Sequence, residues 1–181
     1  MKNKNIAFII IGLVLVSGVY FIAQNQTTLL EAEGKTSIGT KVGDLAPDFT
    51  YTTVDGKTVN SSALDSHVIV ITSSAAWCPT CVSEAQQFSP VYEKYKDRNV
   101  TFITVDIDPR NTKEAITQLK KIANTPWDYA DASGGREIIN KYKLDRFEIT
   151  YIIDTDGAIR FKDNVITSTE QLDQEINNLL L

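Results

Sequence analysis

Residues 67–84 read HVIVITSSAAWCPTCVSE, and this stretch decides the fold. The run from His67 to Ser73 is short, apolar and rich in β-branched residues, which is typical of a central strand buried on both faces. The stretch therefore predicts a buried strand that turns directly into a helix ending near Lys96, with two cysteines at the turn. Beyond those cysteines, aromatic and aliphatic residues recur at helical spacing, at Phe88, Val91, Tyr92 and Tyr95.

The segments downstream alternate in the same way. Val100 to Asp108 reads as a second buried strand. A helix follows, and we expect Asn111 and Glu114 to form the capping box that starts it and Pro126 to stop it. The remaining predicted elements are a short helix near 137–142, a hairpin around Asp156-Gly157 and a final helix capped by Ser168.

Upstream, the segment from Asp48 to Asn60 has β-favouring residues at alternating positions on both sides of Asp55-Gly56. Asp-Gly supplies the positive φ angles that a tight hairpin needs, so this segment predicts an N-terminal β-ribbon. Strands that alternate with helices, followed by a hairpin and a helix, predict an α/β fold with a mixed central sheet flanked by helices.

The N-terminal part of the sequence is strongly apolar, with residues 6–23 reading IAFIIIGLVLVSGVYFIA. As a helix this run spans roughly 27 Å, close to the roughly 30 Å of the hydrocarbon core of a bilayer. Lys2 and Lys4 precede it, so the positive-inside rule leaves the rest of the chain outside the cytoplasm. A cleaved signal peptide is the alternative. We expect a transmembrane signal anchor at 1–23, a polar linker at 24–41 and one folded domain at 42–181.

The composition excludes several functional classes. The chain has 181 residues, a net charge of -5 and no cluster of lysines or arginines, which argues against a nucleic-acid-binding protein. With two cysteines and one histidine, a four-ligand zinc site cannot be built from these residue types alone. The two cysteines therefore have to be interpreted together.

Cys78 and Cys81 lie three positions apart at the start of a predicted helix, close enough to form a small disulfide ring. Free backbone N–H groups and the helix dipole stabilise a thiolate at Cys78 and lower its pKa below the free value of about 8.5. Pro79 fits an early helix position, where its missing N–H costs nothing. The pattern predicts a redox switch in which Cys78 attacks a partner's disulfide and Cys81 resolves the mixed disulfide.

Two other interpretations of the pair remain. A structural disulfide with this spacing closes a loop too small to stabilise the fold appreciably. A copper or zinc site would need a third ligand such as His67, which opens a strand and reads as a solvated edge residue. We therefore expect no resident metal and no cofactor other than the Cys78-Cys81 disulfide.

The sequence is similar to exported thioredoxin-like proteins of the TlpA and ResA type, relatives of the AhpC/TSA proteins in the thioredoxin superfamily. The resemblance implies a thioredoxin-like fold and a membrane-anchored oxidoreductase that reduces disulfides in exported proteins, including apocytochrome c before haem attachment. It covers nearly all of residues 42–181 and is carried by VGDLAPDFTYTTVDGKTVN, SSAAWCPTCVSE, VDID, TPWDYADASGGREIINKYKL and ITYIIDTDGAIRF.

The resemblance also assigns roles to single residues. Cys78 resembles the attacking cysteine, Cys81 the resolving cysteine, and Trp77 the aromatic residue beside them. Glu84 matches the acid three positions after the second cysteine, and a carboxyl group one turn beyond Cys81 can accept its proton. A solvated helix charge is the other interpretation of Glu84. Trp77, Pro79 and Glu148 are the predicted substrate-facing residues.

Glu148 departs from the family pattern, which has a cis-proline at this place, opposite the cysteines. A non-proline cis bond costs about 2.5 to 4 kcal/mol, so we expect the Phe147-Glu148 peptide to be trans. We hypothesise that the Glu148 side chain points near Cys78 and raises the pKa of its thiol by like-charge repulsion with the thiolate. The alternative is that the side chain faces water.

Two rival functions follow from the same residues. The peroxiredoxins share the APDFT opening, but their peroxidatic cysteine aligns with Cys81, their threonine with Cys78 and their arginine near Glu148, which disfavours peroxide chemistry. The other rival is a non-enzymatic copper carrier that binds Cu(I) through Cys78 and Cys81. We predict instead a thiol-disulfide oxidoreductase that acts on exported protein thiols and disulfides and exchanges electrons with a membrane donor or acceptor. The sequence does not fix the direction of exchange, and Pro-Thr between the cysteines supplies no cation, which favours a reductase or a balanced isomerase.

Overall fold

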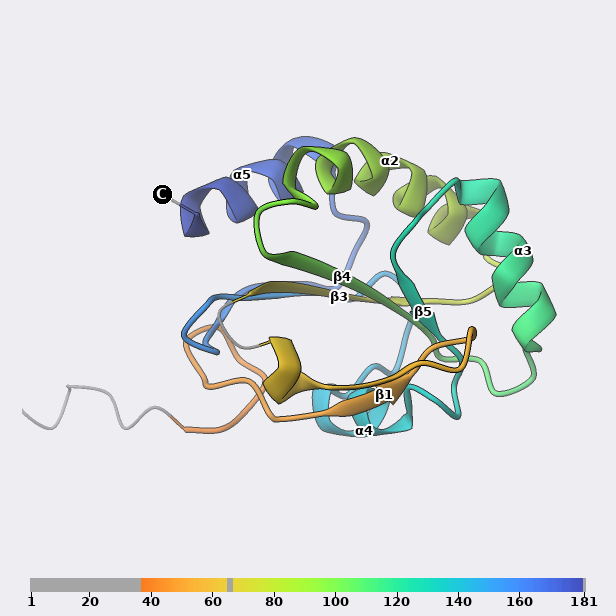
Figure 1. Ribbon diagram of the computed structural model, residues 1–181, viewed down its shortest axis with the longest axis horizontal. Coiled ribbons are helices and arrows are strands. Elements are labelled where there is room, and N and C mark those ends of the chain that lie inside the picture. The colour runs from red at the N-terminus through yellow and green to blue at the C-terminus, as the bar shows by residue number, and fades with distance from the viewer. Residues whose placement is uncertain (1–36, 65–66, 181) are drawn as a thin grey trace, which may run out of the picture. The chain divides into compact units, whose positions relative to one another are not determined.

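The computed structural model describes residues 37–64 and 67–180 (Figure 1). Their elements follow the chain in this order: β1 (Thr50–Thr52), β2 (Thr58–Asn60), the 3-10 helix η1 (Ser61–Leu64), β3 (Val68–Ser74), α2 (Pro79–Tyr95), β4 (Val100–Asp106), α3 (Lys113–Ala123), β5 (Asp128–Ala130), α4 (Arg136–Tyr142), β6 (Thr150–Ile153), β7 (Ile159–Asp163) and α5 (Thr169–Leu179).

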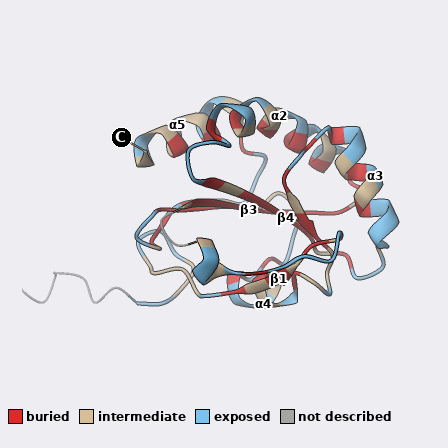
Figure 2. Ribbon diagram, in the orientation of Figure 1, coloured by how far each residue is buried: buried red, intermediate tan, exposed pale blue. Residues whose placement is uncertain are grey.

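The five-stranded sheet has the order β5-β4-β3-β6-β7, with β3 at its centre. β3 pairs in parallel with β4 and antiparallel with β6, so the sheet is mixed as the sequence predicted. All seven residues of β3 are buried (Figure 2). A strand enclosed on both faces must be apolar on both, which explains its unbroken β-branched run.

Alternate residues of β3 enter two separate cores. Val68 and Val70 pack on one face with α2, α3 and α5, whereas Ile69 and Ile71 pack on the other with α4 and the β1–β2 ribbon. Figure 1 shows α2 and α5 on one side of the sheet and α4 on the other. The sheet is therefore the middle layer of three.

The N-terminal ribbon matches its prediction. β1 and β2 pair antiparallel, with Thr52 opposite Thr58, and Gly56 at the turn adopts φ +88. The Asp156-Gly157 hairpin and the Ser168 cap are also confirmed: β6 pairs with β7, and the Ser168 hydroxyl accepts a hydrogen bond from the N–H of Gln171.

Two details differ from the sequence-based expectation. Thr112, not Asn111, caps α3, and its hydroxyl accepts a hydrogen bond from the N–H of Ala115. The Asn111 amide instead donates to both carboxylate oxygens of Asp106, so a tertiary contact takes the side chain away from the cap. The three-residue strand β5 was not predicted, because it is too short for its alternation to stand out.

The predicted membrane anchor lies outside the described residues. Among residues 37–64 and 67–180, no helix is both long enough and apolar enough to cross a bilayer. At the start of the described part, Ile38 forms a β-bridge with Leu45, and the N–H of Gly43 donates to the carbonyl oxygen of Ile159 in β7.

Candidate active site

The cysteines lie at the junction where β3 turns into α2. Cys78 is the N-cap of α2, with an extended backbone (φ -87, ψ 110), and Pro79 opens the helix as predicted. The Sγ atom of Cys78 accepts a hydrogen bond of 3.2 Å from the backbone N–H of Cys81. A sulfur atom therefore takes the place that a serine or aspartate oxygen holds in an ordinary cap, and it faces the positive end of the helix dipole.

Cys78 and Cys81 are joined by a disulfide bond. Both are buried, at 5% and 3% exposure, and pack with Ala75 and the partly buried Phe147. Thr80 Oγ1 lies 3.2 Å from the Cys78 sulfur. Because a disulfide sulfur carries no proton, the hydroxyl is the donor here, and the same hydroxyl can donate to a thiolate after reduction.

An aromatic pair borders the disulfide. Trp77 is 56% exposed, and its ring meets Phe147 edge to face at a centroid distance of 5.1 Å. The indole N–H donates a 2.8 Å hydrogen bond to Asp108. Hydrogen bonds from the Arg110 side chain, from Trp77 and from the backbone of Arg110 hold the pKa of Asp108 well below its usual range. Trp77 is thus a fixed, exposed aromatic surface beside Cys78.

A buried carboxylate holds the segment before the cysteines. Asp106, at the end of β4, accepts hydrogen bonds from the backbone N–H of Ala76 (2.6 Å) and from the Asn111 amide. Burial raises the pKa of Asp106, against the opposing effect of these hydrogen bonds. Asp106 therefore ties the β3–α2 turn to the neighbouring strand β4.

Glu148 lies at the cysteine pair. One of its carboxylate oxygens and the two Sγ atoms lie within 4.8 Å of one another. Its Oε1 atom is buried and has no hydrogen-bond partner among the described residues. No peptide bond in the described part of the chain is cis, so the Phe147-Glu148 bond is trans as expected. The side chain thus points to the sulfur atoms rather than to water.

The backbone that carries Glu148 is fixed by Ser73 at the end of β3. Glu148 adopts φ +64, in the left-handed region that non-glycine residues rarely occupy. Its N–H donates to the carbonyl oxygen of Ser73 at 3.0 Å. The Ser73 hydroxyl donates to the carbonyl oxygen of Arg146 at 2.8 Å and accepts from the N–H of Ile149 at 2.9 Å. The Ser73 N–H also donates to the carbonyl oxygen of Ile149 at 3.0 Å, so four hydrogen bonds at one residue hold the loop before β6 against the cysteine turn.

Glu84 lies one turn beyond Cys81 and is 3% exposed, so it is not a solvated helix charge. Its Oε1 accepts a 3.0 Å hydrogen bond from the N–H of Thr167, just before α5. Burial raises the pKa of Glu84 to about 7; the Thr167 hydrogen bond opposes this rise, and the charges of Glu148 and Asp163 add to it. Glu84 and Cys81 also line a small cavity of about 10 Å³.

Sequence reasoning missed Thr80, Phe147 and Ser73. A threonine between two cysteines, a phenylalanine before a strand and a serine at a strand end carry no distinctive pattern. For Phe147 one signal existed, because it precedes Glu148 in the loop that the sequence placed opposite the cysteines.

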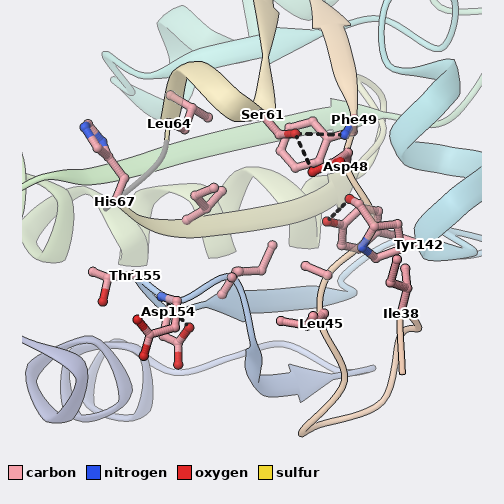
Figure 3. Close-up of a pocket in the computed structure, with 16 residues that line it drawn as sticks. Ile38, Leu45, Asp48, Phe49, Ser61, Leu64, His67, Tyr142, Asp154 and Thr155 are labelled. Carbon is pink, nitrogen blue, oxygen red and sulfur yellow. Dashed lines mark hydrogen bonds between the residues drawn. The ribbon is translucent and has the colours of Figure 1, made fainter. Parts of the chain in front are cut away.

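A pocket of about 460 Å³ lies at the opposite end of β3 (Figure 3). Its lining includes His67 and Ile69 at the start of β3 and Ile153 and Asp154 at the end of the antiparallel β6. The His67 ring lies 3.0 Å from the Thr101 hydroxyl. Neither cysteine lines this pocket, so it takes no part in the disulfide chemistry described above.

The family model described as Redoxin matches residues 41–180. The thiol-disulfide oxidoreductase ResA of Bacillus cereus is 25% identical over 179 residues, which cover 99% of each chain. ResA of Bacillus subtilis is 25% identical over 182 residues and covers 99% of this chain and 96% of its own.

Solved structures show the same fold. The solution structure of a candidate protein disulfide isomerase from Bacteroides thetaiotaomicron superimposes with a TM-score of 0.68 at 26% identity, covering 80% of this chain and 94% of that chain. The predicted thioredoxin-like fold with a mixed sheet flanked by helices is confirmed.

Replacing Glu84 by glutamine is expected to remove a pH dependence of stability. Because the folded state raises the pKa of Glu84 from 4.5 to about 7, the fold binds this proton more tightly than the unfolded chain does. The resulting stabilisation is complete below about pH 4.5 and is lost as the pH rises through about 7, a change on the order of 3 kcal/mol. Urea unfolding of the oxidised protein at pH 4.5 and pH 8.5 measures it.

In that experiment Glu84→Gln should flatten the difference between the two pH values. Glu93→Gln, an exposed change on the same helix, serves as the control and should leave the difference as in the wild type. An undiminished pH dependence in Glu84→Gln would contradict the assignment.

Replacing Glu148 by glutamine is expected to lower the pKa of the Cys78 thiol, because the like charge that opposes the thiolate is removed. The rate of alkylation of the reduced protein as a function of pH reports this value. Asp145→Asn removes an exposed charge from the same loop and is the matched control. An unchanged or higher pKa in Glu148→Gln would show that the carboxylate does not act on the thiolate.

Proposed function

The chain belongs to the Redoxin family, and we propose that it is a membrane-tethered thiol-disulfide oxidoreductase that reduces disulfides of exported proteins. The oxidoreductase activity rests on the Cys78-Cys81 pair, and the observation that carries it is the position of Cys78 as the N-cap of α2. The pair works without a separate cofactor, because the two sulfur atoms themselves store and release two electrons.

In the first step the reduced protein attacks its substrate. The Cys78 thiolate forms a bond to one sulfur of the client disulfide, and the other client sulfur leaves as a thiolate and takes up a proton. The Cys81 N–H and the Thr80 hydroxyl lie at the Cys78 sulfur and stabilise its negative charge. The edge-to-face pair of Trp77 and Phe147 offers an apolar surface on which the client chain can rest.

In the second step Cys81 resolves the mixed disulfide. Its thiolate attacks Cys78, the intramolecular disulfide forms, and the client leaves with its second sulfur reduced. Cys81 must first lose its proton, and Glu84 is the nearby buried acid with a pKa of about 7. A group with that pKa takes up and releases protons near neutral pH, which suits it to act as the base.

The charges at the site support the proposed direction of electron flow. A dithiol becomes a strong oxidant when its reduced thiolate is strongly stabilised. Here a carboxylate of Glu148 faces the sulfur atoms, and like charges disfavour a thiolate. This repulsion partly offsets the stabilisation of the Cys78 thiolate by the helix N-terminus and by the Thr80 hydroxyl. A dithiol with a weakly stabilised thiolate suits a reductant. Such a reductant needs an electron donor in the membrane.

The location is inferred from the sequence. The apolar run at 6–23 is the proposed anchor, and Lys2 and Lys4 before it orient the domain away from the cytoplasm. Exported proteins with disulfides, an apocytochrome c among them, are the proposed clients.

A trapping experiment in cells tests this function. Cys81→Ser removes the resolving thiol, so mixed disulfides between Cys78 and client proteins should accumulate in the membrane fraction. A thiol label that cannot cross the membrane should react with the domain in intact cells. In solution the wild type should reduce insulin, whereas Cys78→Ser should reduce it only at the uncatalysed rate.

Cys78→Ser also serves as the control for trapping, because it has no attacking sulfur. Insulin reduction that survives in Cys78→Ser would refute the mechanism. Trapped complexes confined to cytosolic proteins would refute the location, and rapid consumption of peroxide with no insulin reduction would favour a peroxidase.

A further inference from the structure

We propose that the reduced active site binds a zinc ion through Cys78, Cys81 and Glu148, and that this ion reversibly blocks thiol exchange. Within residues 37–64 and 67–180, these three side chains form the one group of three or more cysteine, histidine or acidic residues able to hold a metal ion. The inference rests on the proposed function only in requiring that the disulfide can be reduced.

The distances allow a shared metal ion. One ligand atom from each residue lies within 4.8 Å of the other two. Zn²⁺ binds thiolate sulfur at about 2.3 Å and carboxylate oxygen at about 2.0 to 2.2 Å, so ligand atoms of a tetrahedral site lie roughly 3.5 to 3.8 Å apart. Reduction frees the two sulfur atoms to move apart toward this spacing, and the Glu148 carboxylate already lies within 4.8 Å of both of them.

The third ligand is held in place and lacks a partner. The buried Oε1 of Glu148 makes no hydrogen bond among the described residues, although buried acceptors are ordinarily satisfied. The Glu148 N–H donates a hydrogen bond to the carbonyl oxygen of Ser73. The Ser73 hydroxyl donates to the carbonyl oxygen of Arg146 and accepts from the N–H of Ile149, which holds the loop on both sides of Glu148. The loop thus presents the Glu148 carboxylate to the sulfur atoms, and a metal ion bound there would give this carboxylate a partner.

The donor set selects the type of metal. Two thiolates exclude magnesium and calcium, which take oxygen ligands. Cu(I) is satisfied by soft thiolate ligands and gains little from a carboxylate, whereas zinc binds both donor types. The two thiolates and one carboxylate make a three-ligand zinc site whose fourth position is left for a water molecule.

Binding depends on the redox state. Zinc replaces the two thiol protons, so one Zn²⁺ and the dithiol give the zinc-bound dithiolate and two protons, with no electron transferred. The disulfide form offers no thiolate and should not bind. Zinc would therefore stabilise only the reduced protein and withhold the Cys78 sulfur from client disulfides.

Metal titration of the full chain tests the inference. The protein is reduced with a phosphine, freed of reductant without oxygen, and titrated with Zn²⁺ against a chromophoric chelator at pH 7. We expect one Zn²⁺ per reduced chain and none per oxidised chain. Cys78→Ser and Cys81→Ser should abolish binding. Glu148→Gln should lower the zinc affinity. The loss should exceed the roughly 10- to 100-fold that follows when a residue that only hydrogen-bonds a metal ligand is removed.

Asp145→Asn, which removes an exposed charge from the same loop, is the matched control and should bind as the wild type does. Cobalt(II) in the wild-type protein gives an independent readout, since a tetrahedral site with two thiolates shows sulfur-to-metal charge-transfer absorption. No zinc bound to the reduced wild type would overturn the inference, as would equal affinity in Glu148→Gln. Client trapping by Cys81→Ser uses no added metal, so the two proposals can fail separately.

Discussion

The hydrogen bond from the Cys81 N–H to the Cys78 sulfur is the contact on which the site depends. It exists because β3 ends at Ser74 and α2 begins at Pro79, which leaves Cys78 in extended backbone at the helix N-terminus. The position gives the first sulfur the donors of the helix end and places the second within bonding reach. The buried sheet fixes one side of this junction, and the Asp106 contact to Ala76 fixes the turn that leads into it.

Two acidic side chains lie at this junction, beside the cysteines. Glu84 belongs to the same helix as Cys81, and burial keeps its pKa near neutral pH. Glu148 comes from the loop before β6, which the Ser73 hydroxyl joins to the end of β3. The end of β3 therefore leads into the cysteine turn and, through Ser73, also accepts hydrogen bonds from the loop that carries Glu148. Any shift of β3 against β6 would move Glu148 relative to the sulfur atoms.

Most of the strands and helices could be predicted from the sequence, because strong periodic patterns specify them. Each of three patterns is compatible with only one type of element: the β-branched run with the strand β3, the helical spacing after Cys81 with the helix α2, and the Asp-Gly dipeptides with hairpin turns. The capping residue of α3 was misassigned by one position, since Asn111 and Thr112 are both good caps and only the contact with Asp106 separates them. β5 is too short to show a period.

The candidate site was predicted less completely than the fold. One motif contains Trp77, Cys78, Pro79 and Cys81. Glu148 was predicted only through the family resemblance, which implies a proline at its position. The hydrogen bonds that hold Glu84 and Glu148 come from Thr167 and Ser73, which are distant in sequence, so no local pattern reveals them.

The reduction potential of the Cys78-Cys81 pair tests the central claim most directly. Equilibration of the protein with mixtures of reduced and oxidised glutathione, followed by quantification of the two thiols, gives this value. A reductase whose thiolate is opposed by a facing carboxylate should show a single two-electron transition below about -150 mV. A potential above about -150 mV, in the range of strong disulfide oxidants, would contradict the account.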